Sequence, residues 1–169
     1  RAALDAAFAQ TARIPGDCGD EYRRPPFLTA SGDLSHHLDA LPPVWPPERV
    51  RDGRTRVSSG SVWEPLAGYC RAVRDGSRIA VSGTTATHGS GRTVGIGDAG
   101  VQTTYVLDKM AAALSALGGR LEDVVRTRVY LTDVDDWRAV AAQHGRVFGA
   151  IRPANTMLQV AALIGPDYK

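Results

Sequence analysis

Cysteine is scarce in this chain, which has only Cys18 and Cys70 among its 169 residues. The two cysteines are far apart and belong to no paired pattern, which indicates reduced thiols in a cytosolic protein rather than a disulfide framework. No apolar run approaches the ~20 residues that a membrane span needs. The first ten residues also lack the charged and then apolar order of a signal peptide. We therefore expect a cytoplasmic protein with no membrane partner.

A strong excess of one charge is missing as well. The chain has 20 lysines and arginines against 18 acidic residues, which gives a net charge of +2. A nucleic-acid surface needs a basic stripe rather than a slight excess, so we expect no nucleic-acid partner. No cluster of cysteines or carboxylates completes a metal site around the histidines, and we expect no metal. The histidines are His36, His37, His88 and His144.

Prolines concentrate in the first third of the chain, with pairs at 25–26, 42–43 and 46–47. We expect an Ala-rich helix over residues 1–14 and then an irregular arm, because proline blocks helices and central strands. The arm either wraps on a neighbouring surface or is a solvated linker. We therefore divide the chain into residues 1–55, the helix and arm, and residues 56–169, a compact domain.

The compact part alternates strands and helices. Residues 124–131 alternate apolar and polar side chains, which is typical of a strand with one buried face. Asp98 and Gly118-Gly119 have the character of an N-cap and a left-handed helix end. The predicted strands are 57–61, 69–73, 78–82, 124–131 and 152–163, and the predicted helices are 99–117 and 135–148. This order predicts an α+β fold, in which a mixed sheet carries two helices on one face.

Four separated segments carry a resemblance to a known family. They are GYCRAV at 68–73, IAVSGTT at 79–85, the long stretch from 101 to 133, and RPANTMLQVAAL at 152–163. Together they resemble the reactive intermediate deaminases, the Rid/YjgF family often labelled endoribonuclease L-PSP. The resemblance covers roughly residues 56–169 in order and spacing.

The resemblance implies a chorismate-mutase-like fold, assembled as a homotrimer with a barrel-like core and three clefts between subunits. It implies hydrolysis of enamines and imines to carbonyl compounds and ammonia, without a metal or organic cofactor. Active members carry an arginine after Pro-Ala in the last segment, which binds the substrate carboxylate through two hydrogen bonds. Here that position is Asn155, which supplies no charge. We therefore expect altered handling of 2-imino acids.

At other positions of the family site, this chain has the family's residue in some cases and a different residue in others. Tyr69 matches a cleft tyrosine and Ser82 a serine in the turn after a strand, whereas Ala141 stands where an asparagine is frequent. The family also continues with a strand that contains a water-positioning glutamate, beyond the position of Lys169. We take Tyr69 and Ser82 as the catalytic candidates, which orient a carbonyl or a water. The alternative for both hydroxyls is packing with a hydrogen-bonded tip.

Three residues are candidates for substrate binding. Asn155 either contacts the ligand or makes local hydrogen bonds at the surface. Arg152 either replaces the missing cation or is a solvated strand entry. His88, in a Gly-rich loop, is the histidine best placed for proton transfer, with a structural role as the alternative. We regard the G-x-G-x-x-G at 95–100 as accidental, because no strand leads directly into it.

These observations leave more than one function open. The first hypothesis is a hydrolase for a small carbonyl-derived metabolite, with Asn155 contacting a neutral or weakly polar substituent. The second is a small-molecule-binding or accessory protein of the same family without turnover, suggested by the missing arginine and asparagine. RNA cleavage follows only from the old family label and has no sequence support here.

Overall fold

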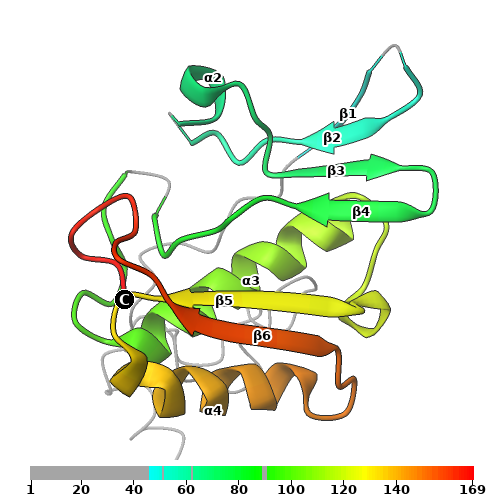
Figure 1. Ribbon diagram of the computed structural model, residues 1–169. Helices are drawn as coiled ribbons and strands as arrows, with labels where there is room; N and C mark the ends of the chain where they lie inside the picture. The colour runs from blue at the N-terminus through cyan, green and yellow to red at the C-terminus, as the bar shows by residue number, and fades with distance from the viewer. Residues whose placement is uncertain (1–45, 51, 62, 89–90) are drawn as a thin grey trace, which may run out of the picture.

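The computed structural model describes residues 46–50, 52–61, 63–88 and 91–169. The predicted helix over 1–14 and most of the proline-rich arm lie outside these residues. Figure 1 shows two separate sheets, with one long helix behind both of them. This arrangement confirms the predicted α+β class.

The first sheet is antiparallel, with strands in the order β1-β2-β3-β4. The second is a parallel pair, β5-β6, in which Thr127 lies opposite Asn155. The strands are β1 Pro47–Arg49, β2 Thr55–Val57, β3 Ala72–Asp75, β4 Arg78–Val81, β5 Arg126–Leu131 and β6 Ala154–Gln159. The helices are α2 Trp63–Ala67, α3 Ala99–Ala116 and α4 Trp137–Phe148, with 3-10 turns η4 Leu121–Asp123 and η5 Val134–Asp136.

Helix α3 is the central element of the fold. The Asp98 side chain accepts a hydrogen bond from the Val101 amide at its start, and Gly118 takes the left-handed conformation just after its end, as predicted. Small buried residues on α3 let the backbone approach the first sheet closely. The residues in this contact are Val57, Ala72, Ala112, Ala113 and Leu117.

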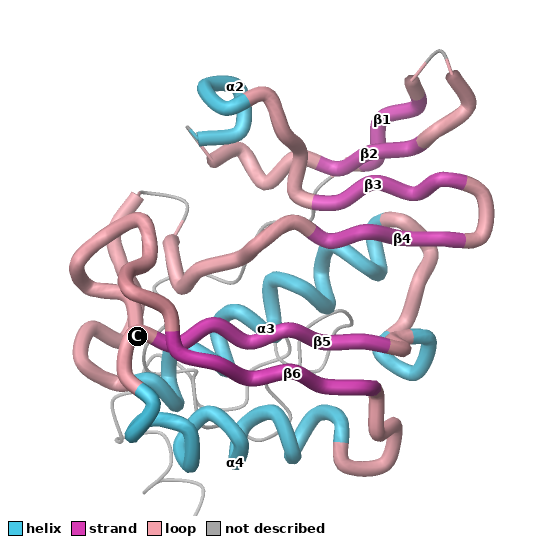
Figure 2. The backbone as a smooth tube through the Cα atoms, in the orientation of Figure 1, coloured by secondary structure: helices cyan, strands magenta, loops and turns pink. Residues whose placement is uncertain are grey.

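The second sheet packs on the other end of α3 and on α4 (Figure 2). Leu131 of β5 contacts Ala99 and Val140, and Met157 of β6 packs against them. The alternation predicted along β5 is present, since Thr127 and Leu131 are buried and the residues between them are more exposed. The two helices therefore hold two sheets that do not pair with each other in the described ranges.

The strand predictions over 57–61 and 69–73 are wrong in position. Strand β2 ends at Val57, and β3 begins at Ala72. The short helix α2 lies between them, where Pro65 falls within the first turn and so breaks no hydrogen bond of the helix. Gly68 follows with a φ of 70°, which ends the helix in the left-handed region.

A groove of about 870 Å³ separates β4 from β5. Its walls include Ile79, Val81 and Val129, and α3 contributes Val106 and Met110. In the described part of the chain, β4 pairs only with β3, and β5 pairs only with β6. Both walls are thus strand edges with backbone groups that another strand could pair with.

No helix in the described ranges is both long and apolar enough to cross a lipid bilayer.

Candidate functional site

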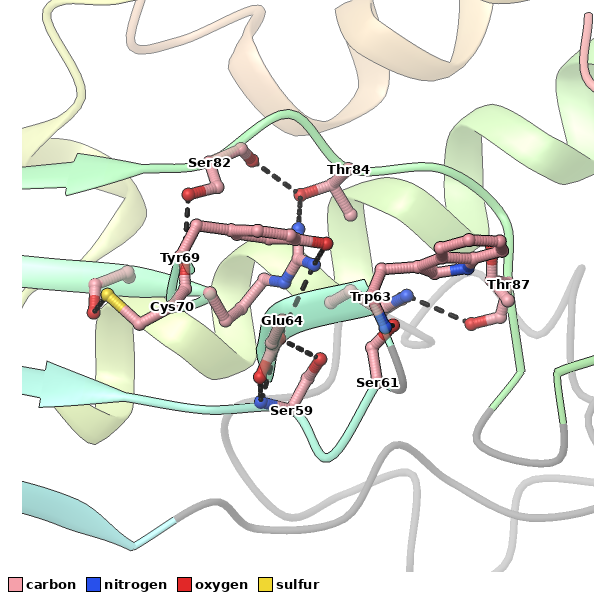
Figure 3. Close-up of polar contacts among 12 residues, drawn as sticks. Ser59, Ser61, Trp63, Glu64, Tyr69, Cys70, Ser82, Thr84 and Thr87 are labelled. Atoms are coloured by element: carbon pink, nitrogen blue, oxygen red, sulfur yellow. Dashed lines mark hydrogen bonds and ion pairs between the residues drawn. The ribbon is translucent and has the colours of Figure 1, made fainter. Parts of the chain in front are cut away.

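The two predicted catalytic hydroxyls lie at the same end of the first sheet. Tyr69 follows α2, and Ser82 follows β4. The pairing of β3 with β4 continues beyond the strands, because the Ser82 amide donates to the Arg71 carbonyl at 2.9 Å. The Ser82 hydroxyl also donates to the Cys70 carbonyl at 2.7 Å. Figure 3 shows both side chains, and the Tyr69 hydroxyl lies 3.5 Å from a guanidinium of the same segment.

That guanidinium belongs to Arg71, whose side chain is only 5% exposed. Its Nη1 donates to the Gly83 carbonyl at 2.8 Å and to the Thr84 hydroxyl at 3.0 Å. Its Nη2 lies 3.5 Å from both the Glu64 carboxylate and the Tyr69 hydroxyl. Its Nε has no hydrogen-bond acceptor among the described residues. One edge of this buried cation is therefore weakly satisfied.

Glu64 is the carboxylate that faces Arg71, and its side chain is 4% exposed. Both of its oxygens accept from the Ser59 amide, at 3.1 and 3.0 Å. The Ser59 hydroxyl donates to Oε1 at 2.5 Å. Glu64 thus fixes the loop after β2 against α2.

Lys109 adds a second buried cation from α3. Its ammonium donates to the carbonyls of Thr87 at 2.9 Å and Thr85 at 3.3 Å. It also lies 5.7 Å from the centre of the Tyr105 ring. Burial, and next the positive charge of Arg71, lower the pKa of Lys109 to about 8, while Glu64 opposes this shift. We call Glu64, Tyr69, Arg71, Ser82, Thr84 and Lys109 the Arg71 cluster.

A second polar cluster joins β5, β6 and α4. The Asn155 amide donates to the Thr127 hydroxyl at 2.9 Å, and that hydroxyl lies 2.9 Å from Nε2 of His144. The His144 ring packs on Phe148 with centroids 4.7 Å apart. Burial lowers the pKa of His144, which favours the neutral ring. We call these three polar residues the Asn155 cluster.

The other two binding candidates, Arg152 and His88, are not members of either cluster. Arg152 is exposed, has a φ of 54°, and donates from Nε to the Gly149 carbonyl at 3.4 Å. It therefore turns back toward the end of α4. His88 closes a tight loop in which its amide donates to the Arg92 carbonyl and its carbonyl accepts from the Gly91 amide. The structure brings Tyr69 and Ser82 together, but it does not bring Arg152 or Asn155 to them through any hydrogen bond in the described part.

Sequence reasoning missed the charged members of the Arg71 cluster. Two signals point to them in retrospect. Helix α3 is buried on most sides, so a lysine within it needs buried partners. Arg71 likewise interrupts an apolar stretch that leads into a strand, and its partner Glu64 is seven residues earlier in an unpredicted helix. Across the described ranges, no group of three or more His, Cys, Asp or Glu side chains could hold a metal ion.

The comparisons with known proteins agree with this fold. Residues 60–169 match the family model described as Endoribonuclease L-PSP. The chain belongs to this family. An uncharacterized protein of Streptomyces coelicolor is 40% identical over 109 residues, covering 64% of this chain and 81% of the relative. The 3-aminoacrylate deaminase RutC of Acinetobacter baylyi is 35% identical over 103 residues, covering 61% of this chain and 81% of the relative.

Among solved structures, a member of the YjgF/YER057c/UK114 family from Mycobacterium tuberculosis is similar, with a TM-score of 0.62 and 44% identity. The match covers 68% of this chain and 91% of that one. The YjgF gene product of E. coli matches with a TM-score of 0.54 and 28% identity, over 60% of this chain and 80% of that one. The Rid/YjgF resemblance in the sequence is therefore confirmed.

Proposed function

We propose that this protein hydrolyses enamines or imines of small carbonyl compounds, releasing the carbonyl compound and ammonia. Family membership and the relative named 3-aminoacrylate deaminase support this reaction class. The single observation that carries the proposal is the placement of both hydroxyls at one end of the first sheet (Figure 3). The Tyr69 hydroxyl lies 3.5 Å from Arg71, and Ser82 bonds to the carbonyl of Cys70, the residue next to Tyr69. We further propose that the active form is a cytoplasmic homotrimer whose clefts require no metal or organic cofactor.

The hydroxyls can orient a water without becoming nucleophiles. Ser82 donates its proton to the Cys70 carbonyl, so its lone pairs remain available to accept from a water. The Tyr69 hydroxyl accepts weakly from Arg71 and can donate its own proton. In the reaction, water adds to the carbon of the protonated C=N bond. The tetrahedral carbinolamine then expels ammonia and leaves the C=O group.

The groove between β4 and β5 is a poor candidate for the substrate site. Both of its walls are strand edges, and Tyr168 and Lys169 also line it. The family resemblance implies a further strand after the position of Lys169. We propose that such a strand pairs in this groove, and that the substrate lies at the Arg71 cluster instead.

The direct test is ammonia release from freshly generated imines, both acidic and neutral, measured against the rate in water. We expect release that falls at least tenfold in Tyr69→Phe together with Ser82→Ala. No release above the water rate from any imine would overturn the enzymatic proposal.

The second candidate is a binding protein without turnover. It is favoured by the fact that the hydroxyls of Ser82 and Thr84 already donate to backbone carbonyls. Ligand binding without ammonia release would support that candidate.

A further inference from the structure

The guanidinium of Arg71 has one well-bonded edge and one weakly bonded edge. Nη1 is satisfied by Gly83 and Thr84 at 2.8 and 3.0 Å. On the opposite edge, Nε has no acceptor among the described residues, and Nη2 has only two contacts at 3.5 Å. An unmet donor on a side chain only 5% exposed is costly unless something else binds it.

Another arginine in this chain shows what that edge can hold. On Arg56, Nε and Nη2 each donate to one oxygen of the Glu48 carboxylate at 3.0 Å. This two-bond arrangement is the geometry in which arginine binds a carboxylate most favourably. Arg71 presents the same pair of donors, but there the Glu64 carboxylate approaches only Nη2, at 3.5 Å, and Nε has no acceptor among the described residues. Nε and Nη2 of Arg71 are therefore donors of the type that binds a planar acid group.

The charges around Arg71 do not balance either. Arg71 and Lys109 are 4% and 7% exposed as residues, and Glu64 is the buried carboxylate in ion-pair contact with Arg71. The Lys109 ammonium is bonded to two neutral carbonyls. Within the Arg71 cluster, two buried cations therefore face one carboxylate, while the buried Asp108 of α3 is not part of this cluster and has a partner of its own. This excess of positive charge within the cluster favours an anion.

The surroundings place such an anion near the two candidate catalytic hydroxyls. The Arg71 guanidinium lies 5.6 Å from the centre of the Tyr69 ring, which is half-buried and covers it. The hydroxyls of Tyr69 and Thr84 contact the same guanidinium, and Figure 3 shows Ser82 bonded to Thr84. A small acid held there would have its neighbouring carbon next to these hydroxyls, with the Tyr69 ring as the side chain that must move.

We propose that the Nε–Nη2 edge of Arg71 binds the carboxylate of a small acidic ligand. The positive charge missing at Asn155 is in this way supplied from the other sheet. This assignment rests on the proposed function for the identity of the site. It differs from the expectation that a neutral substituent is preferred, and it makes Arg71 the residue that sets specificity.

The test is equilibrium binding by calorimetry of pyruvate, the smallest stable 2-oxo acid, and of pyruvamide, which has the same shape without the charge. We expect the wild-type protein to bind pyruvate at least tenfold more tightly. Arg71→Gln should abolish the preference, Arg71→Lys should restore part of it, and Lys109→Met should reduce it severalfold. Arg56→Gln, the exposed matched control, should leave it unchanged. Equal binding of the two ligands by the wild type would overturn the proposal.

Two further binding measurements make the result interpretable. Arg71→Gln leaves Glu64 unpaired, so the double variant Arg71→Gln/Glu64→Gln, which removes both charges, serves if the single variant does not fold. The double variant must also lose the preference. Inorganic phosphate that displaces pyruvate with the same Arg71 dependence would overturn the carboxylate assignment in favour of a general oxyanion site.

The binding assay also separates this inference from the proposed function. If pyruvate binds in an Arg71-dependent way but no imine releases ammonia, the proposed hydrolase activity is wrong and the carboxylate site at Arg71 is supported. If the imines of pyruvate and of pyruvamide release ammonia with equal kcat/KM, the hydrolase activity is supported and the carboxylate site at Arg71 is wrong.

Discussion

The two polar clusters of this molecule differ in charge and in burial. The Arg71 cluster, on the antiparallel sheet and α3, contains two buried cations and one buried carboxylate. The Asn155 cluster, on the parallel pair and α4, is built from an amide, a hydroxyl and a neutral imidazole. The difference teaches that the capacity to bind an acid lies with Arg71, although the family resemblance directs attention to Asn155.

The largest expected effect concerns the ion balance of the Arg71 cluster. Glu64→Gln keeps the shape of the side chain but leaves the buried Arg71 without its ion-pair partner. Removing one partner of a buried ion pair costs about 3–5 kcal/mol, so we expect the free energy of unfolding to fall by that amount in urea titrations. Glu48→Gln, which breaks an exposed pair with Arg56, is the control and should change little. A loss below about 1 kcal/mol at Glu64 would show that the cluster does not depend on this carboxylate.

The second effect is a pH dependence set by Lys109, whose pKa falls from 10.5 to about 8 on folding. The unfolded chain then holds more protons than the folded chain between these values. The free energy of unfolding should therefore rise as the pH increases from about 8 to 10.5, by roughly 3 kcal/mol. Lys109→Met should remove that rise in denaturation curves recorded across the window. The same slope in the variant and the wild type would assign the titration to another group.

The third effect contrasts the two clusters directly. Asn155→Ala removes a neutral hydrogen bond to Thr127, so we expect a stability loss of at most about 1 kcal/mol. Asn155→Arg should leave the ratio of kcat/KM for acidic and amide imines within twofold of the wild type, since the acid group is held at Arg71. A tenfold rise of this ratio in Asn155→Arg would instead place the substrate acid group beside β6.

The smallest effect concerns His144, whose pKa burial lowers from 6.5. The unfolded chain binds a proton more readily at this residue, so the folded state loses stability as the pH falls below about 6.5. His144→Gln should flatten this part of the stability profile slightly. The measurement is the melting temperature between pH 7.5 and 5.5, and a steeper profile in the variant would contradict the shift.

The sequence was sufficient for the elements with strong local signals. Asp98 as a cap, Gly118 as a stop and the apolar stripe between them predicted α3 closely, and alternation predicted β5. Helix α2 escaped prediction because its five residues are too few for a periodic pattern and contain Pro65. Because of this helix, β3 begins about three residues later in the chain than predicted.

The candidate site was predictable only where the resemblance marked a position. Tyr69 and Ser82 were found in that way, whereas Arg71 was not, because its importance depends on contacts with Gly83 and Thr84 far along the chain. Lys109 was missed for the same reason, since its partners lie more than twenty residues away. Non-local pairing of charges leaves little trace in a single sequence.

The most direct measurement of the central claim is a crystal structure of the protein with pyruvate bound. Our account predicts the two carboxylate oxygens at about 2.7–2.9 Å from Nε and Nη2 of Arg71. It also predicts that the Tyr69 ring is displaced and the Ser82 hydroxyl lies beside the carbonyl carbon. A carboxylate bound at Asn155 or Arg152, with the Arg71 fork still empty, would contradict it.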